Sequence, residues 1–111
     1  MNFKEYQELA MRTRNTKLTE ENHLLNGALG LNGEAGEVAD VVKKHLMQGH
    51  MLDAEHIIKE LGDCLWYIAE AATALGVSME QIADRNIEKL KKRSPQGFDT
   101  ANSQHRSEGD I

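Results

Sequence analysis

The sequence predicts an all-α protein with four main helices per chain, in which oligomerisation completes the helical bundle. Apolar residues recur every three to four positions over long segments, as on one face of a helix. No segment shows the alternation of a half-buried strand. Capping residues, glycines and a proline divide the chain at intervals typical of helices. We expect a single all-α domain at residues 1–98 and a polar C-terminal tail at residues 99–111.

The composition is that of an ordinary globular protein, with 40% hydrophobic and 28% charged residues among 111. The net charge of −5 disfavours nucleic acid as a partner. No run approaches the roughly 18 apolar residues of a membrane span. The opening MNFKEYQEL lacks the apolar region of a signal peptide. We therefore expect a cytoplasmic protein that binds neither nucleic acid nor membrane.

The first two expected helices begin at capping residues. Asn2, with Glu5 three positions on, caps a helix that reaches about residue 14. Thr19 caps a second helix, which runs to about Gln48. The second helix contains four glycines at a spacing of three, and each costs roughly 1 kcal/mol relative to alanine. They indicate either close approach by another backbone or ligand, or a kink near residues 30–33. These glycines are Gly27, Gly30, Gly33 and Gly36.

The third expected helix, at about residues 53–75, is apolar on most of its sides. Asp53 caps it, and only an arc near Lys59, Glu70 and Thr73 is plainly polar. A helix apolar on most sides is buried on most sides. One short chain can hardly cover it, so we infer burial against a second subunit, most simply by two-fold symmetry. We expect Trp66 to pack between the subunits.

The fourth expected helix begins at a capping box, Ser78-Met79-Glu80-Gln81, and reaches about Arg93. Pro95 and Gly97 end it. The tail that follows is polar and lacks periodicity. We expect the tail to be mobile, or held by contacts with a neighbour.

Two carboxylate pairs at helical spacing carry the chemistry. Glu34 pairs with Glu37, and Glu60 pairs with Asp63. Residues three apart lie on one face of a helix, so antiparallel packing of the two helices would bring four carboxylates together. Like charges in such a cluster repel unless they take up protons or bind cations. Oxygen ligands suit a hard cation such as Mg²⁺, so we predict that all four acids are metal ligands.

The segments that hold these acids resemble a known family. GEAGEVADVVKK, followed by ELGDCLWYIA and NIEKLKKRSPQGF, is similar to the MazG-like all-alpha nucleoside triphosphate pyrophosphohydrolases. The family is marked by E-x-x-E and E-x-x-D pairs, which the four acids match across a gap of 22 residues. The resemblance implies Mg²⁺ bound by these acids, hydrolysis of a triphosphate to the monophosphate and pyrophosphate, and active sites formed in homodimers or homotetramers. Ser94 in RSPQGF departs from the family, where an aromatic residue is expected.

Several residues are candidates for the reaction itself. Glu34 or Glu37 is the candidate general base that activates water. Positive charge beside the acids would help to bind phosphates, and Tyr67, one turn beyond Asp63, could stack on a base or bond to a phosphate. The alternative for the basic residues is a solvated helix end favoured by the helix dipole. The candidate substrate-binding residues are Lys44, Tyr67, Asn86, Lys89 and Arg93.

Other functions remain open on the sequence. A non-catalytic helical dimer could bind a nucleotide, a metal or a partner protein. Phosphoribosyl-ATP pyrophosphohydrolase, an enzyme of histidine synthesis, is similar to this superfamily. A di-iron bundle would use E-x-x-H motifs. Glu20-x-x-His23 and the related Asp53-x-x-His56 are expected at helix starts, away from the acidic pairs, which disfavours di-iron.

Overall fold

The computed structural model describes residues 1–106 and 109–111, which form α-helices and no β-strand. The all-α prediction is therefore confirmed. None of the helices in these ranges is both long and apolar enough to cross a membrane. The chain divides into residues 1–79 and residues 80–111, and each unit is described by itself. The helices are α1 (Phe3–Met11), α2 (Glu20–Gln48), α3 (Ala54–Ala74), α4 (Met79–Arg93) and α5 (Thr100–Gln104).

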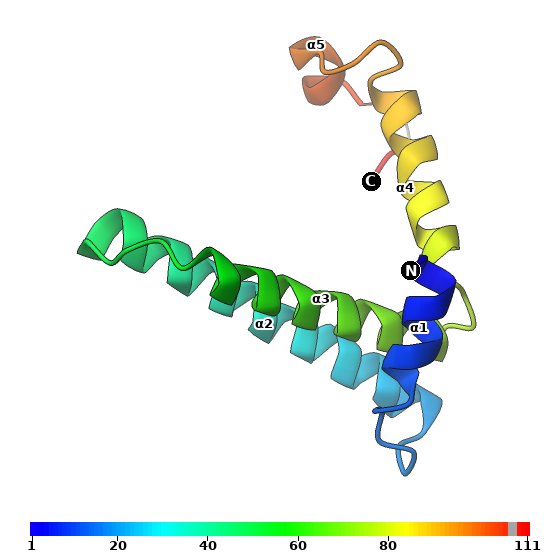
Figure 1. Cartoon of the computed structure of the whole chain (residues 1–111). Coiled ribbons are helices and arrows are strands. Elements are labelled where there is room, and N and C mark those ends of the chain that lie inside the picture. The colour runs from blue at the N-terminus through cyan, green and yellow to red at the C-terminus, as the bar shows by residue number, and fades with distance from the viewer. Residues whose placement is uncertain (107–108) are drawn as a thin grey trace. The chain divides into compact units, whose positions relative to one another are not determined.

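Helices α2 and α3 form an antiparallel hairpin, the main element of the first unit (Figure 1). The Thr19 side chain accepts a hydrogen bond from the Asn22 amide at 3.2 Å, so it caps α2 as predicted. Gly49 ends α2 at φ 71°, a left-handed conformation that glycine adopts without strain. The Asp53 carboxylate then accepts from the His56 amide at 3.0 Å and starts α3. These local signals fix where the chain reverses direction.

Two of the four glycines in α2 allow α3 to approach closely. A β-carbon on Gly27 would lie 3.1 Å from the Tyr67 carbonyl oxygen. A β-carbon on Gly30 would overlap the Tyr67 ring. Gly33 and Gly36 meet no described atom within 4 Å of that position. Helix α2 runs through all four without a break, so close approach is confirmed at two glycines and the alternative of a kink is wrong.

Helix α1 lies across the C-terminal end of α3 (Figure 1). The Trp66 indole nitrogen donates to the Ala10 carbonyl at 3.1 Å and to the Thr13 hydroxyl at 2.8 Å. Gln7 donates to the Thr73 hydroxyl at 3.0 Å. The Trp66 ring therefore lies against α1 of its own chain, and its packing between subunits stays a prediction. The contact between α1 and Trp66 joins residues 56 and 53 positions apart, which no local pattern predicts.

The apolar core within the chain is small. The buried apolar residues among those described are Ala10, Ala69, Ala72 and Met79. Long aliphatic side chains recur along α2 and α3 but remain exposed to solvent. Apolar side chains stabilise a fold only when they are removed from water, so these residues contribute little within the single chain. The large exposed apolar residues of the hairpin helices are Leu24, Leu25, Leu29, Leu46, Met47, Ile58, Leu61 and Leu65.

A polar group is buried in the hairpin where a polar surface was expected. Glu70 and His23 are each 1% exposed, and His23 Nδ1 lies 2.9 Å from Glu70 Oε2. The Asn26 amide donates to the other Glu70 oxygen at 2.8 Å. Glu70 is thus not part of the solvated arc that the sequence predicted. Its two oxygens both have partners on α2, which offsets the cost of burying them.

The second unit contains most of α4, together with α5. The Asp99 carboxylate accepts from the Ala101 amide at 2.8 Å and caps α5. Residues 100–104 of the tail thus form a short helix, which the lack of periodicity in the sequence did not indicate. Further along, Asp110 accepts two hydrogen bonds from the Arg93 guanidinium at 3.0 and 2.9 Å. The end of the described chain is thus held against α4 of its own unit.

Candidate metal centre

Three of the four predicted acids meet at the middle of the hairpin. Glu34 lies on the side of α2 that faces α3, in the row that also contains Gly27 and Gly30. Glu60 and Asp63 are one turn apart on α3. Carboxylate oxygens from Glu34, Glu60 and Asp63 all lie within 4.8 Å of one another. Glu34 and Glu60 are half-buried, and Asp63 is exposed, so the cluster is open to solvent on one side.

The proximity of these acids changes the protonation of Glu34. A hydrogen bond with Glu60 raises the pKa of Glu34 to about 7, with further contributions from desolvation and from the charges of Glu60, Asp63 and Glu37. A carboxyl–carboxylate hydrogen bond requires one proton, so at neutral pH the pair holds a proton for part of the time. A cation can replace that proton and remove the same repulsion.

The donor set fits a hard divalent cation. All three groups are carboxylates, and they come from two rigid helices that hold them in place. Mg²⁺ prefers oxygen ligands, binds through few carboxylates and usually keeps several waters. The open side at Asp63 leaves room for those waters or for phosphate oxygens. Among the residues that the structure describes, this is the group of acidic, histidine or cysteine side chains placed to share an ion.

Glu37, the fourth predicted ligand, lies beside the cluster and not within it. Its side chain is exposed, and it faces a hollow of about 470 Å³ at the loop end of the hairpin. Its charge still contributes to the raised pKa of Glu34. The structure thus brings three of the four acids together and places the fourth next to them, one turn further along α2.

Lys44 lines the same hollow as Glu37 but already has a partner. Its ammonium nitrogen lies 2.8 Å from an Asp40 oxygen, one turn earlier on α2. This hydrogen bond raises the pKa of Lys44 and lowers the pKa of Asp40. A phosphate that binds Lys44 therefore has to compete with Asp40.

Tyr67 adjoins the acids, as its position one turn beyond Asp63 predicted. A hollow of about 350 Å³ is lined by Glu34, Asp63, Trp66 and Tyr67. The two rings meet edge to face, with centroids 5.2 Å apart and planes at 85°. The carboxylates and the aromatic rings thus share one recess.

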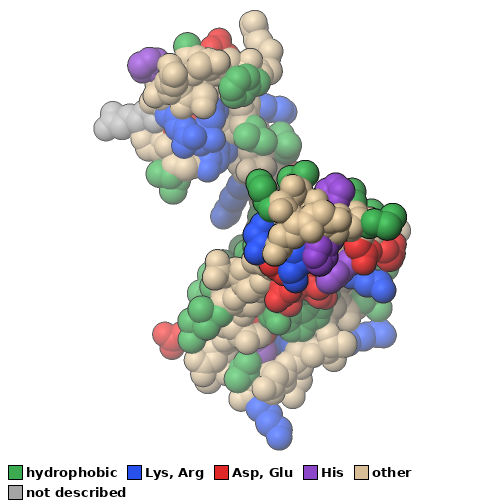
Figure 2. All heavy atoms as spheres, turned by 90° about the vertical axis from the view of Figure 1, so that its left-hand side faces the viewer, with side chains coloured by type: hydrophobic (Ala, Val, Ile, Leu, Met, Phe, Trp, Pro, Cys, Tyr) green, Lys and Arg blue, Asp and Glu red, His purple; other side chains and the backbone are tan. Residues whose placement is uncertain are grey.

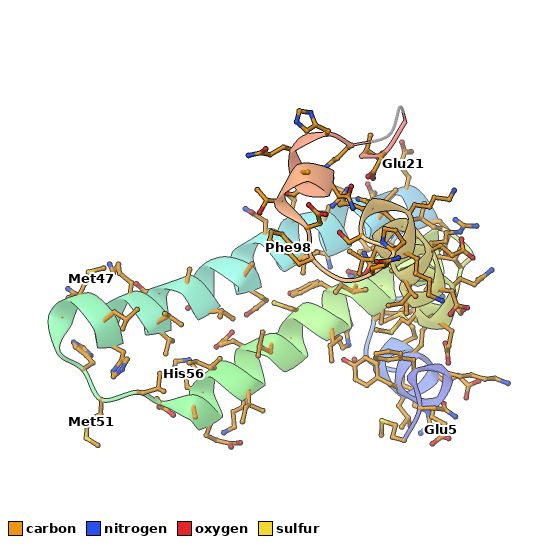
Figure 3. The ribbon with its side chains drawn as sticks, turned by 90° about the horizontal axis from the view of Figure 1, so that it is seen from above. Glu5, Glu21, Met47, Met51, His56 and Phe98 are labelled. Carbon is orange, nitrogen blue, oxygen red and sulfur yellow. The ribbon has the colours of Figure 1, made fainter. Side chains whose placement is uncertain are left out.

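His56 is a neighbour of the cluster that the sequence analysis placed elsewhere. Its Nε2 lies 3.2 Å from Glu60 Oε1, one turn away on α3. Figure 3 shows His56 on the side of α3 that faces α2, near the loop of the hairpin. The expectation that Asp53-x-x-His56 lies away from the acids is wrong, and the spacing of four from Glu60 could have revealed this contact. His23, by contrast, is held by Glu70.

The three substrate-binding candidates on α4 belong to the second unit. Asn86 is exposed, Lys89 is half-buried, and Arg93 is hydrogen-bonded to Asp110. Lys89 and Arg93 lie one turn apart, on the shared face that their spacing predicted. Their role in binding substrate stays a prediction.

With this geometry in place, comparison with known proteins identifies the class. The model of the MazG nucleotide pyrophosphohydrolase domain matches residues 22–98, more than half of the chain, and the chain therefore belongs to that family. The Gene 37 protein of Mycobacterium phage L5 is 38% identical over 73 residues, which cover 62% of this chain and 64% of the phage protein. The chain thus spans less than two thirds of that relative's length. No solved structure matches the present chain.

Proposed function

We propose that this protein is a Mg²⁺-dependent nucleoside triphosphate pyrophosphohydrolase, which converts a ribo- or deoxyribonucleoside triphosphate to the monophosphate and pyrophosphate. The observation that carries the proposal is the meeting of Glu34, Glu60 and Asp63 within 4.8 Å in a member of this family. The same cluster without a cation would repel a triphosphate, so the arrangement is suited to phosphate chemistry when a divalent ion is bound.

Glu34, Glu60 and Asp63 would hold the ion. Bound Mg²⁺ would neutralise charge on the phosphates and stabilise the charge that develops as the phosphoanhydride bond breaks. The protein's own contribution is to hold the three carboxylates in position on two helices. His56, which contacts Glu60 Oε1, would restrict how that carboxylate turns.

Glu37 is the better placed of the two candidates for general base. Glu34 shares a proton with Glu60 and belongs to the group that would bind the ion. Glu37 stands one turn away, exposed and outside that group. A carboxylate beside the ion, but not bound to it, can orient a water and accept its proton as the water attacks phosphorus.

The recess formed with the aromatic rings would receive the rest of the nucleotide. Trp66 and Tyr67 line it together with two of the acids. A ring next to a phosphate site offers a stacking surface for a nucleobase, or a phenol hydroxyl for a phosphate oxygen. The Tyr67 ring can lie this close to α2 because Gly30 has no side chain.

We further propose that the functional form is a homodimer or homotetramer. Large apolar side chains on both helices of the hairpin are exposed in the single chain, including Leu29, Ile58 and Leu61 at 65%, 60% and 51%. Large apolar side chains exposed in such number are characteristic of an interface. A second copy with two-fold symmetry would cover the same stripes on each partner.

The test is a screen for pyrophosphate release over ribo- and deoxyribonucleoside triphosphates, with phosphoribosyl-ATP included, with and without Mg²⁺. We expect release from at least one triphosphate with Mg²⁺ and none without it. Asp63→Asn should abolish release, whereas Glu21→Gln, an acid in the first turn of α2, should not. Release by Asp63→Asn at the normal rate would contradict the metal role. Binding of triphosphates without release across the panel would instead favour a non-catalytic helical dimer.

A further inference from the structure

The Trp66 indole forms a closed hydrogen-bond network with the end of α1. Its nitrogen donates to the Ala10 carbonyl at 3.1 Å and to the Thr13 hydroxyl at 2.8 Å. The Thr13 hydroxyl itself donates to the Ala10 carbonyl at 2.8 Å, so its hydrogen is used there and a lone pair is left for the indole. The edge of the Trp66 ring is therefore held by two acceptors whose own positions are fixed at the end of α1.

The same ring is a wall of the recess beside the acids. Trp66 lines the hollow of about 350 Å³ together with Glu34, Asp63 and Tyr67, and it meets Tyr67 edge to face. Histidine, acidic and basic side chains gather at the loop end of the hairpin (Figure 2). The recess is therefore the place beside the acids where a flat ring of a ligand would find aromatic contacts.

A second side chain of α1 lies close to the acids. Tyr6 packs against the small apolar core, as Trp66 does. Burial raises the pKa of Tyr6, and the negative charge of Asp63 raises it further. Helix α1 thus adjoins the recess through Tyr6 as well as through its bonds to Trp66. Residues 3–11 lie outside residues 22–98, the range that matches the family model, so this contact is not part of the matched domain.

We propose that α1 orients Trp66 for the nucleotide, with Thr13 as the positioning residue, and that the indole contacts the nucleobase through its ring alone. The inference deepens the proposed function and rests on it, because the nucleotide would be the substrate of that reaction. An indole has one N–H donor, and α1 already uses it. Every base has a face that can stack on an aromatic ring. Trp66 therefore adds affinity for a nucleotide without distinguishing one base from another.

The first measurement uses the free protein. Trp66 is the single tryptophan of the chain, so intrinsic fluorescence reports on this ring alone. Thr13→Val keeps a branched side chain but removes the hydroxyl, and we expect acrylamide to quench Trp66 more strongly in it because the ring is less restrained. Two variants should match the unaltered chain: Thr13→Ser, which keeps the hydroxyl, and Thr16→Val, the same change at an exposed position in the following turn. Circular dichroism of each variant checks that the helices remain.

The second measurement adds the four common deoxynucleoside monophosphates with Mg²⁺. The proposed reaction does not consume them, so their binding can be followed at equilibrium by the change in Trp66 fluorescence. We expect at least one to bind, and each that binds should bind about fivefold more weakly to Thr13→Val, the size of one hydrogen bond. Deoxyribose 5-phosphate, which has no base, should leave the fluorescence unchanged. With a triphosphate that yields pyrophosphate, Thr13→Val should raise KM about fivefold and leave kcat unchanged, as loss of uniform binding does.

The outcomes separate this inference from the proposed function. No change of Trp66 fluorescence with any monophosphate, or equal affinity in Thr13→Val and Thr13→Ser, would overturn the inference. A loss confined to one base would show that Trp66 distinguishes bases, and an equal loss in Thr16→Val would show a general effect of the turn, so either result would overturn it as well. Such results in a chain that releases pyrophosphate would leave the proposed function standing. The expected binding in a chain that releases none would refute the hydrolysis alone.

Discussion

The ring of Tyr67 on α3 lies directly against the backbone of Gly30 on α2, where a β-carbon would overlap it. Gly30→Ala should therefore displace the ring and lower the free energy of unfolding by about 1–3 kcal/mol, as overpacking does. Urea unfolding followed by circular dichroism measures the change. Gly33→Ala is the matched control, because no described atom lies near its added carbon. Its higher helix propensity should leave stability unchanged or raise it by up to about 1 kcal/mol. Equal losses in the two variants would contradict the close approach at Gly30.

The buried contact between His23 and Glu70 should be costly to break from one side. Glu70→Ala leaves His23 and Asn26 without their acceptor and should destabilise the chain by about 3 kcal/mol or more. Replacing both members, as in His23→Leu with Glu70→Leu, should cost less than the single change, since no polar group is then left alone. Urea unfolding measures the stability of each variant, and Glu55→Ala, at an exposed position on α3, is the control. A single variant as stable as the control would show that the pair is not buried.

The raised pKa of Glu34 predicts how the metal-free protein responds to pH. Its value of about 7, against 4.5 for an ordinary glutamate, means that the folded state holds more protons than the unfolded state between these values. Stability should therefore fall as pH rises from about 4.5 to 7 and then level off. Thermal midpoints in metal-free buffer across this range measure the slope, and Glu34→Gln should flatten it. If Glu34→Gln showed the same dependence of the thermal midpoint on pH, the dependence would arise from other titratable groups.

Mg²⁺ should reverse the loss of stability that accompanies deprotonation of Glu34. Because the ion takes the place of the proton, it should raise the thermal midpoint most above pH 7 and least near pH 5. An equal increase at both pH values would indicate that the ion binds away from Glu34.

His56 should support the metal site without being required for the fold. Its Nε2 is 3.2 Å from Glu60 Oε1, and its side chain is 45% exposed. His56→Ala leaves that carboxylate free to turn, and should weaken divalent-ion affinity by up to about tenfold. Affinity for Mn²⁺ in the absence of nucleotide measures this, and His50→Ala is the control from the adjacent loop. Unchanged affinity in His56→Ala would mean that Glu60 is positioned by the helix alone.

Local sequence signals predicted the helices well, because caps and stops act within a few residues. Thr19 and Asp53 cap α2 and α3 through the hydrogen bonds that their residue types favour. Gly49 and Gly76, both in the left-handed conformation, follow the predicted ends of α2 and α3. Three of the four acids meet, since their spacing and the antiparallel hairpin are both readable from the sequence.

What the sequence did not reveal depends on which face of each helix meets its neighbour. The buried residues of α2 are His23 and Gly27, not its leucines, because α3 approaches most closely where α2 has glycine. Glu70 consequently lies inside although its type suggests a surface position. Two hydrogen bonds join residues far apart in the sequence: Trp66 donates to Ala10 of α1, and Arg93 donates to Asp110. No periodic pattern in the sequence predicts such contacts.

The central claim is that Glu34, Glu60 and Asp63 share one divalent ion, and Mn²⁺ binding followed by electron paramagnetic resonance tests it most directly. The account predicts one bound Mn²⁺ per cluster, displaced by excess Mg²⁺, lost in Asp63→Asn and retained in Glu21→Gln. Binding that persists unchanged in Asp63→Asn, or the absence of bound Mn²⁺ in the unaltered protein, would contradict it.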